Sequence, residues 1–458
     1  MKKLEDITRI YFIGIGGIGM SALARYFRFH GKKVSGYDKT ETVLTKELVK
    51  EGIPVHYEDR LDLAPKDADL VVYTPAIPAS HQELAYYKAN GYALAKRSEV
   101  LGIITNSSFN ICVAGTHGKT TISTMIAHLL RHSGYGCNAF LGGISVNYNS
   151  NYWSDKRSVC VVEADEYDRS FLRLSPDVAV ISAMDPDHLD IYGTAEAMEE
   201  AFIEFSGKLK SGGSLYFKYG LKRGADLKGE TKLSYSQDNK AANYFASTLQ
   251  NKNGGYVFDV VGGDWTLKEV ELNMGGLHNV ENSVVAVAVA HALGIEDLKV
   301  KEAVAAFRGV KRRFEYVVRN KKWVFVDDYA HHPEELRALI SSARKLFPDR
   351  KCVVIFQPHL FTRTRDFADG FAESLDLADE AMLLPIYPAR ELPIEGVSSN
   401  TIFEKMKSRN KQLLNKSEIL ENLKAVAGKK GEPVLLITAG AGDIDQLVEP
   451  IKNILEKA

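Results

Sequence analysis

The stretch GTHGKTT, residues 115–121, decides the fold of the middle of this chain. It follows an apolar run at residues 109–114 and precedes a helical pattern at residues 122–132. Strand, glycine loop, Lys-Thr pair and helix together are typical of a nucleoside triphosphate site, because backbone N–H groups and the helix N-terminus face the phosphate oxygens. We expect Lys119 to reach the β- and γ-phosphates and the Thr120 hydroxyl to bind Mg²⁺.

The loop departs from the usual pattern GxxxxGK[ST], because Val113 stands where that pattern has its first glycine. A turn followed by a helix start is the alternative interpretation. The agreement of strand, glycines, lysine, hydroxyls and helix favours the nucleotide site. The residues expected around the phosphates are Gly115, Thr116, His117, Gly118, Lys119, Thr120 and Thr121.

A second glycine loop, GIGGIG at residues 14–19, lies between an apolar run at residues 10–13 and a helix-like segment at residues 20–29. Taken alone, it is the dinucleotide fingerprint, with Asp38 at the end of the next strand on a ribose. The glycines indicate only a pyrophosphate, so a nicotinamide or flavin enzyme and a UDP-sugar enzyme both fit. The triphosphate loop disfavours hydride transfer, which has no use for ATP. The expected contacts are Gly14, Gly16, Gly17, Gly19 and Asp38.

Length and composition limit the number of domains and the classes of partner. The 458 residues suffice for about three domains, and the net charge of −1 gives no global field for nucleic acid or an anionic membrane. The four cysteines show no CxxC spacing, which suits a reducing compartment. No apolar run approaches the roughly 18 residues of a membrane span. We therefore expect a cytoplasmic protein with no nucleic-acid partner and no membrane insertion.

Strand and helix patterns alternate along the chain and predict an α/β fold of three domains, at residues 1–107, 108–309 and 310–458. The first and third are expected to be Rossmann-like, and the second to be built around the P-loop. The polar residues 105–108 are typical of a linker. In the third domain we expect a helix at residues 366–374.

Acidic residues follow two predicted strands of the middle domain. EADE, residues 163–166, leaves the apolar strand at 158–162, so Glu163 in particular is expected to hold Mg²⁺ beside the phosphate loop. DPDHLD, residues 185–190, follows the strand at 178–182 and makes His188 a second metal candidate. A solvated acidic turn and an Asp-Pro turn with a solvated histidine are the plainer interpretations.

Two further segments allow two interpretations each. Asn279 in HNVEN either caps the helix that follows or hydrogen-bonds a nucleotide. Arg312, in the pair of residues 312–313, either clamps a phosphate or is a surface basic residue.

Three polar clusters of the third domain all follow predicted strands, where open α/β sheets bind ligands. DDYAHHP spans residues 327–333, QPHLFTRTR spans 357–365 and GAGD spans 440–443. Asp327 or Asp328 is equally suited to cap a helix. His359, Arg363 and Arg365 are suited to grip a carboxylate or phosphate.

The order and spacing of these motifs resemble the Mur ligase family, ATP-dependent amide ligases of peptidoglycan synthesis. The motifs are GIGGIGMS, GTHGKTT, EADE, DHLDIY, HNVEN, GVKRRF, DDYAHHP, FQPH with TRTRD, YPARE and GAGD, from Gly14 to Asp443. The resemblance implies a UDP-binding domain, a central ATPase and a C-terminal ligase domain. It implies UDP-N-acetylmuramate and L-alanine as substrates, ATP and Mg²⁺ as cofactors, and a monomer or weak homodimer.

The resemblance also implies roles for single residues. Mg²⁺ would be held by Thr120, Glu163 and His188. ATP would contact Asn279, Arg312, Asp328 and Tyr329 besides the phosphate loop. The muramyl carboxylate and the incoming amine would face His331, His359 and Arg363, which with Lys119 are the catalytic candidates. Many relatives carry Arg where this chain has Leu360, and often His where it has Asp59, so one cation is missing and the uracil contact stays open.

The implied chemistry is transfer of the γ-phosphoryl group to a carboxylate, followed by attack of the amine on the acyl phosphate. His331 or His359 is the expected base. Three rivals are open: a ligase that recycles a tripeptide onto UDP-N-acetylmuramate, a nicotinamide oxidoreductase that leaves Lys119 unexplained, and a nucleotide switch that leaves the histidine clusters unused.

Overall fold

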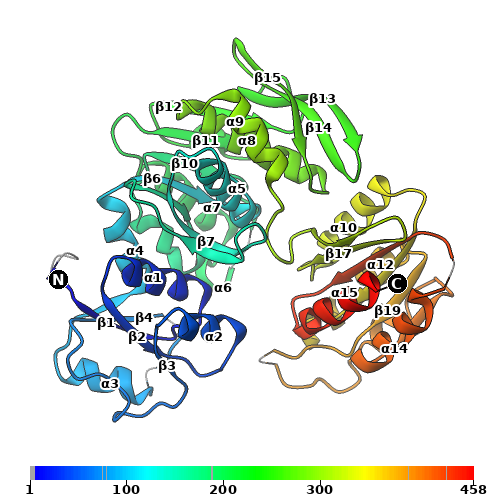
Figure 1. Cartoon of the computed structure of the whole chain (residues 1–458), viewed down its shortest axis with the longest axis horizontal. Coiled ribbons are helices and arrows are strands. Elements are labelled where there is room, and N and C mark those ends of the chain that lie inside the picture. The colour runs from blue at the N-terminus through cyan, green and yellow to red at the C-terminus, as the bar shows by residue number, and fades with distance from the viewer. Residues whose placement is uncertain are drawn as a thin grey trace. The chain divides into compact units, whose positions relative to one another are not determined.

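The computed structural model describes most of the chain, and among the described residues the strands form three sheets (Figure 1). The described ranges are 6–74, 76–78, 80–186, 189–389, 391–429 and 431–457. The chain divides into two compact units. The first is Met1–Ser247, Val260–Leu267 and Glu281–Ala303, and the second is Thr248–Asp259, Lys268–Val280 and Val304–Ala458.

The N-terminal sheet is parallel throughout, with strand order β3-β2-β1-β4-β5. Its elements are β1 (Arg9–Ile13), α1 (Ile18–Phe29), β2 (Lys33–Tyr37), α2 (Val43–Lys50), β3 (Val55–His56), β4 (Leu70–Tyr73), α3 (Gln82–Ala89), β5 (Leu94–Lys96) and α4 (Arg97–Asn106). The strand order reverses between β1 and β4, which opens a crevice at their carboxyl ends. The first glycine loop follows β1, so it lies at that crevice.

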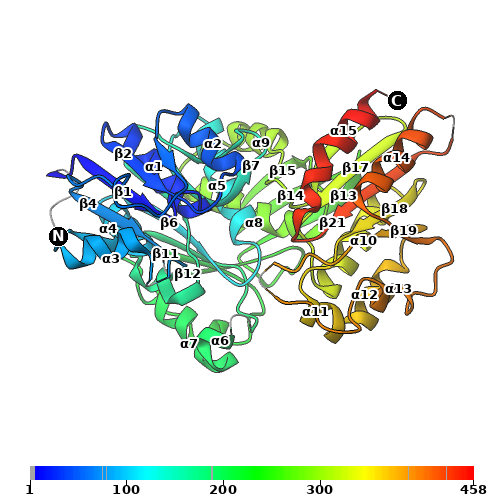
Figure 2. The same ribbon diagram turned by 90° about the horizontal axis from the view of Figure 1, so that it is seen from below.

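The middle sheet has the order β15-β14-β13-β12-β11-β10-β6-β9-β7-β8, with β6 between two parallel neighbours, β10 and β9. Helices α5 and α7 lie on opposite faces of this sheet (Figure 2). The strands are β6 (Phe109–Ala114), β7 (Asn138–Ser145), β8 (Ser150–Trp153), β9 (Val159–Glu163), β10 (Val178–Ile181), β11 (Ser214–Lys218), β12 (Thr231–Ser236), β13 (Tyr244–Lys252), β14 (Gly255–Gly262) and β15 (Trp265–Leu272). The helices are α5 (Lys119–His132), α6 (Leu189–Tyr192), α7 (Ala195–Ser206), α8 (Leu277–Ala292) and α9 (Asp297–Ala306).

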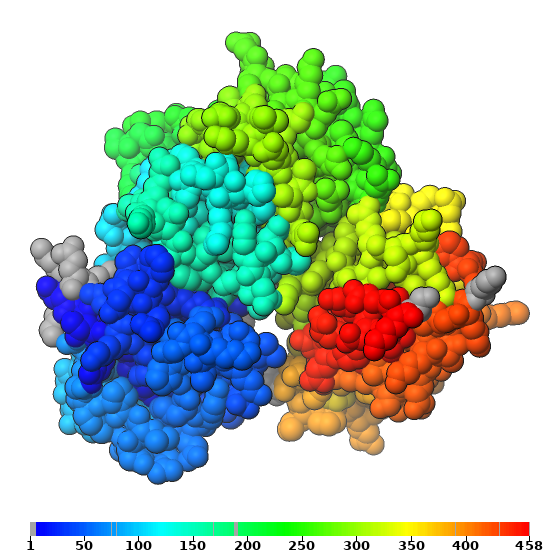
Figure 3. Space-filling model, in the orientation of Figure 1, coloured from blue at the N-terminus to red at the C-terminus, as the bar shows by residue number. Residues whose placement is uncertain are grey.

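The C-terminal sheet has the order β16-β17-β21-β18-β19-β20, and helices cover both of its faces (Figure 2). One face packs against α10 and α12 and the other against α14 and α15. Helix α15 turns Ile451 and Leu455 to the sheet and its other side to the molecular surface (Figure 3). The elements are β16 (Glu315–Arg319), β17 (Trp323–Asp328), α10 (Pro333–Leu346), β18 (Lys351–Phe356), α11 (Phe361–Asp366), α12 (Ala368–Leu375), β19 (Glu380–Leu383), α13 (Asn400–Phe403), β20 (Lys411–Leu413), α14 (Lys416–Ala427), β21 (Val434–Ala439) and α15 (Val448–Glu456).

The α/β class and the main strand–helix order are confirmed, and one local prediction, the linker at residues 105–108, is wrong. Helix α4 runs into the predicted linker at 105–108, where the Thr105 hydroxyl donates to the Gly102 carbonyl inside the helix. The helix predicted at 366–374 corresponds to α12, and helix α11 before it was not predicted. Strands β3, β5, β7, β8, β12, β13, β16 and β20 were also not predicted. Within the described ranges, no helix has the length and hydropathy needed to cross a membrane.

Candidate active site

The second glycine loop joins β6 to α5 at the carboxyl edge of the middle sheet. Gly115 has φ of 132°, and a Cβ there would lie 2.3 Å from Ser182 Oγ and 2.8 Å from the Ala183 amide nitrogen. Only glycine fits this approach, because the obstacle includes backbone. The Ser182 hydroxyl donates to the Ala114 carbonyl, 3.2 Å away, and to the carbonyl of His117. The loop is therefore held in place by the strand β10 beside it.

Lys119, the first residue of α5, carries the ammonium group of this loop. Its Nζ lies 2.6 Å from Glu166 Oε1 and 2.6 Å from the Gly115 carbonyl oxygen. The Glu166 side chain is 1% exposed and that of Lys119 is 14% exposed. Burial raises the pKa of Glu166, and the nearby ammonium partly offsets that rise. The lysine is thus fixed beside the loop that it is expected to serve.

Thr120 and Glu163 form the candidate metal site. Thr120 Oγ1 donates to Glu163 Oε1 across 3.0 Å, and Glu163 Oε2 accepts from the Gly142 amide at 2.9 Å. Two ligands about 2.1 Å from Mg²⁺ in adjacent octahedral positions are about 3 Å apart, so these two oxygens fit that ion. Burial raises the pKa of Glu163, a cost that a cation would remove.

The third predicted metal ligand, His188, lies outside the described residues. The described parts of the chain contain no cluster of three or more His, Cys, Asp or Glu side chains that is arranged around a metal position. Thr120 and Glu163 are therefore the pair on which a magnesium site rests.

The other loop residues differ in exposure. Thr116 and Thr121 are buried, and Thr116 Oγ1 accepts from the Asp185 amide at 3.2 Å. The His117 ring is 66% exposed, with Nε2 3.9 Å from Asp185 Oδ2. Gly118 is the N-cap of α5. A Cβ on Gly118 would lie 3.2 Å from Asn282 Oδ1, so α8 brings Asn282 to this loop.

Asn279, the residue predicted at the nucleotide, is one turn earlier on α8. It is 2% exposed, and its Nδ2 donates to the Gly275 carbonyl at 2.7 Å. Asn279 is the third residue of α8, so it is not the N-cap of that helix, and this bond ties the first turn to the segment before it.

The first glycine loop is held by Asp38, which follows β2. Asp38 Oδ2 accepts from the Gly16 amide at 2.7 Å, and Gly17 is the N-cap of α1. Gly14 donates its amide to the Tyr37 carbonyl at 2.8 Å, which ties the loop to the same strand. Gly19, in the first turn of α1, lies against the side chain of Arg97. The loop therefore presents a helix N-terminus, and Asp38 fixes its shape.

In the C-terminal sheet, the acid pair at the end of β17 organises the turn before β16. Asp328 accepts from the amides of Phe314 at 2.6 Å and Ala330 at 2.7 Å, and burial raises its pKa to about 6. Asp327 is 1% exposed, accepts from Thr438 Oγ1 at 2.6 Å, and has its pKa raised by burial to about 7.

Arg312 packs beside these acids. Its guanidinium lies 5.0 Å from the centre of the Tyr329 ring and donates to the carbonyl of Gly440. Its Nε is 3.8 Å from Asp327 Oδ2. The structure thus brings together Arg312, Asp328 and Tyr329, three of the residues predicted at ATP.

A row of rings follows at the carboxyl ends of β17 and β18. The His331 ring centre lies 5.2 Å from that of Tyr329 and 6.1 Å from that of His359, which stacks on Tyr387 at 5.9 Å. His331 Nδ1 is 2.9 Å from the Tyr329 carbonyl oxygen. Burial lowers the pKa of His331, and Arg363 and Arg313 lower it further, against the opposing effect of Glu335. His331 is therefore neutral near pH 7.

Arg363 completes this group from α11. Its Nη1 is buried and has no hydrogen-bond partner in the described part of the chain. A buried guanidinium nitrogen without an acceptor indicates an anionic ligand. Leu360, at the N-cap of α11, has φ of 69° and ψ of 138°, a strained conformation for a residue with a side chain.

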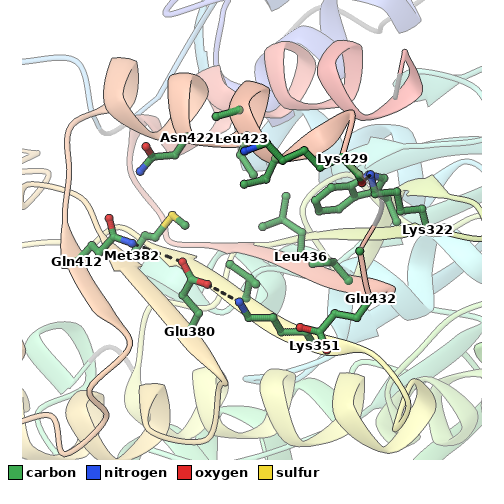
Figure 4. A pocket seen from close by; sticks show the side chains of 16 residues that line it. Lys322, Lys351, Glu380, Met382, Gln412, Asn422, Leu423, Lys429, Glu432 and Leu436 are labelled. Carbon is green, nitrogen blue, oxygen red and sulfur yellow. Dashed lines mark hydrogen bonds and ion pairs between the residues drawn. The ribbon is translucent and has the colours of Figure 1, made fainter.

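A cavity of about 490 Å³ lies at the other edge of the same sheet (Figure 4). Trp323, Lys351 and Val434 line it at the amino ends of their strands, and Lys351 Nζ pairs with Glu380 Oε2 at 2.8 Å. The histidines and Arg363 follow the carboxyl ends, where α/β sheets bind ligands. The cavity is therefore not the candidate active site.

Three family models match consecutive parts of the chain. They are the Mur ligase family catalytic domain at residues 9–108, the Mur ligase middle domain at 113–290 and the Mur ligase glutamate ligase domain at 312–442. The chain belongs to the Mur ligase family. It is an ATP-dependent amide ligase of three α/β domains.

Among Mur ligases, two curated UDP-N-acetylmuramate–L-alanine ligases match almost end to end. That of Flavobacterium johnsoniae is 47% identical over 459 residues, covering 99% of both chains. That of Parabacteroides distasonis is 50% identical over 461 residues, covering 99% of this chain and 98% of the other. The solved UDP-N-acetylmuramate–alanine ligase of Thermotoga maritima superposes with a TM-score of 0.81 at 29% identity over 98% of each chain.

Several residues of this Mur ligase site were not predicted. Glu166 was one of four residues in a predicted metal motif, and only the structure turns it toward Lys119. Tyr387 and Glu391 belong to YPARE, whose residues had no assigned role, yet Glu391 accepts from the Thr362 amide and hydroxyl at the start of α11. Arg97 belongs to no motif.

Proposed function

We propose that this Mur ligase joins L-alanine to UDP-N-acetylmuramate and converts ATP to ADP and phosphate, in the synthesis of peptidoglycan precursors. The observation that carries the proposal is a pair of separate anion-binding loops in the first unit. Residues 14–19 open α1 and would hold the UDP diphosphate, and residues 115–121 open α5 and would hold the ATP phosphates. The UDP group would anchor the muramyl substrate, and ATP would activate its carboxylate.

Activation is the task of the residues around α5. A carboxylate is a poor acyl donor, because its leaving group would be oxide. Phosphoryl transfer from ATP converts it to an acyl phosphate and releases ADP. The Lys119 ammonium would offset charge on the γ-phosphoryl oxygens. Mg²⁺, held by Thr120 and Glu163, would neutralise phosphate charge when bound.

Amide formation is the task of the residues of the second unit. The amine of L-alanine attacks the acyl carbon, phosphate leaves, and the ammonium must first lose a proton. His331 is the proposed base, because its lowered pKa leaves the ring neutral at working pH. Arg363 would bind a carboxylate through its buried Nη1. His359 stacks on Tyr387 and meets the His331 ring edge-on, so it would orient His331.

The remaining assignments follow from the same proposal. We place the domains at residues 1–107, 108–309 and 310–458. Asn279, Arg312, Asp328 and Tyr329 would contact ATP. We expect the enzyme in the cytoplasm as a monomer or weak homodimer, because its substrates are soluble nucleotides and an amino acid.

The test measures phosphate release from ATP with UDP-N-acetylmuramate and one amino acid or peptide at a time. The proposal predicts release that needs both co-substrates and is fastest with L-alanine, with one amide product per phosphate. Fastest release with a tripeptide would assign a recycling reaction instead. Release that needs neither co-substrate would contradict amide ligation.

A further inference from the structure

Arg97, the first residue of α4, lies against the first glycine loop. A Cβ built on Gly19 would be 2.8 Å from Arg97 Nη1 and 3.0 Å from its Cδ, so the absence of a side chain at Gly19 makes room for the guanidinium. Gly19 is the second residue of α1, a helix of 12 residues. The Arg97 cation therefore lies over the N-terminal turn of α1, where backbone N–H groups already favour an anion.

The Arg97 guanidinium has few interaction partners among the described residues. Its Nη2 is 3.8 Å from Asp165 Oδ2, beyond hydrogen-bond distance, and no hydrogen bond of the group is found among the described residues. The Arg97 side chain is 25% exposed, so a ligand can reach it. Five N–H donors in a rigid fork beside a helix N-terminus are suited to a phosphate.

We propose that Arg97 is a ligand of the UDP diphosphate, donating to its β-phosphate from beside the N-terminal turn of α1. The proposal rests on the proposed assignment of residues 14–19 to UDP. The diphosphate would offset the repulsion between the Arg97 cation and the positive end of α1, which favours the bound state.

Asp165 connects the proposed Arg97 contact with the residues proposed for ATP. It belongs to the segment that follows β9 and carries Glu163 and Glu166, the partners of Thr120 and Lys119. Arg97, Asp165 and Glu163 line one small cavity. Asp165 Oδ2 lies 3.8 Å from Arg97 Nη2, an ionic contact without a hydrogen bond. A single segment therefore lies beside both the side chain proposed for the UDP diphosphate and those proposed for ATP.

The experiment measures binding of UDP and of UMP by calorimetry, without ATP, to wild type, Arg97→Ala and Arg97→Lys. UDP affinity should fall about 10- to 100-fold in Arg97→Ala, whereas UMP affinity should change less than about threefold, because UMP lacks the β-phosphate. Arg97→Lys keeps the charge without the fork, so it should retain an intermediate UDP affinity. The UDP–UMP difference is insensitive to partial unfolding, which would weaken both ligands equally.

Matched variants separate this contact from its surroundings. Arg173 forms an ion pair with Glu99 of α4, at 2.8 Å. Arg173→Ala therefore removes an arginine near the same helix and should leave UDP binding unchanged. Asp165→Asn should weaken UDP binding by a smaller factor than Arg97→Ala. Equal losses for UDP and UMP in Arg97→Ala, or no loss for either, would overturn the proposal.

A loop variant distinguishes that failure from failure of the UDP assignment. A side chain at Gly16 would meet Thr45 Cγ2 at 2.7 Å and Asp38 Oδ2 at 2.8 Å, so Gly16→Leu should deform the loop and abolish UDP binding. If Gly16→Leu abolishes binding and Arg97→Ala does not, the role of Arg97 is wrong and the loop assignment stands. If both variants bind UDP as wild type does, both are wrong.

Discussion

Lys119 and Glu166 form a buried ion pair whose energy can be measured separately from its chemistry. The N–O distance is 2.6 Å. At an effective dielectric constant of about 20, two unit charges at that distance attract by about 6 kcal/mol before desolvation is counted. Removing one partner of a buried pair typically costs about 3–5 kcal/mol, because the other charge is left uncompensated. Lys119→Met should therefore destabilise the fold as well as stop turnover.

The double variant separates these two effects. Lys119→Met leaves the Glu166 carboxylate, 1% exposed, without its cation, whereas Lys119→Met with Glu166→Gln leaves no buried charge. At roughly 2–4 °C per kcal/mol, the single variant should unfold about 6–20 °C below wild type, and the double variant should recover most of that loss. Neither should release phosphate, because both lack the ammonium that would face the γ-phosphoryl group.

The pH dependence of the stability of Lys119→Met provides an independent test. Burial raises the folded-state pKa of Glu166, and loss of the lysine removes an effect that lowers it. The folded Lys119→Met variant therefore binds a proton that its unfolded chain has released, so its stability falls as pH rises. Thermal unfolding at pH 6 and pH 8 should show a larger deficit at pH 8. A Lys119→Met variant as stable as wild type at both values, or an active double variant, would refute the reasoning.

Three further outcomes are expected. Thr120→Val and Glu163→Gln should each raise the Mg²⁺ concentration for half-maximal activity at least about tenfold, measured by phosphate release in a magnesium titration, because each removes one of the two candidate ligands. The raised pKa of Asp327, about 7 against an ordinary 3.8, means that its unfolded form loses the proton first, so wild-type stability should fall between about pH 4 and 7, and Asp327→Asn should flatten that fall in urea unfolding. Leu360→Gly should be about 1 kcal/mol more stable than Leu360→Ala in the same assay, because only glycine adopts φ of 69° with ψ of 138° without strain.

The sequence predicted best where several local signals agree. The apolar run, the glycines, the Lys-Thr pair and the helical pattern of residues 109–132 all require the same strand–loop–helix, and β6 and α5 follow it. The clusters at residues 327–333 and 357–365 were also placed correctly at carboxyl ends of strands, because parallel strands share that edge.

The errors arise where polar residues are satisfied by contacts distant in sequence. Residues 105–108 are polar, as a linker would be, yet Thr105 is fully buried and its carbonyl accepts from Asn110 Nδ2 at 2.8 Å. Strand β12 pairs with β11 and β13, and the alternation of Leu233 and Tyr235 with polar residues is a strand pattern that the prediction missed. A polar composition alone therefore excludes neither a strand nor a buried helix end.

The prediction of the site residues was incomplete for a related reason. Side chains of a motif leave the backbone in different directions, so the sequence singled out Glu163 of EADE for metal but assigned no separate role to Glu166. In the structure Glu163 accepts from Thr120 while Glu166 accepts from Lys119. Arg97 follows β5, at the side of the N-terminal sheet, whereas Gly19 follows the central strand β1, and no spacing in the sequence connects the two residues. Only the packing of α4 beside α1 brings the two together.

The charges around α5 have one more consequence for how the nucleotide binds. Lys119, Glu163 and Glu166 carry a net negative charge when both acids are ionised, and burial raises the pKa of each acid against the opposing effect of Lys119. Such a site repels a free triphosphate despite its glycine loop. A divalent ion bound by Thr120 and Glu163 would make the net charge of the site positive. A phosphate oxygen could then replace Glu166 as the partner of Lys119. We infer that ATP binds as its magnesium complex, and that Glu166 holds the lysine in position until the γ-phosphate takes over that contact.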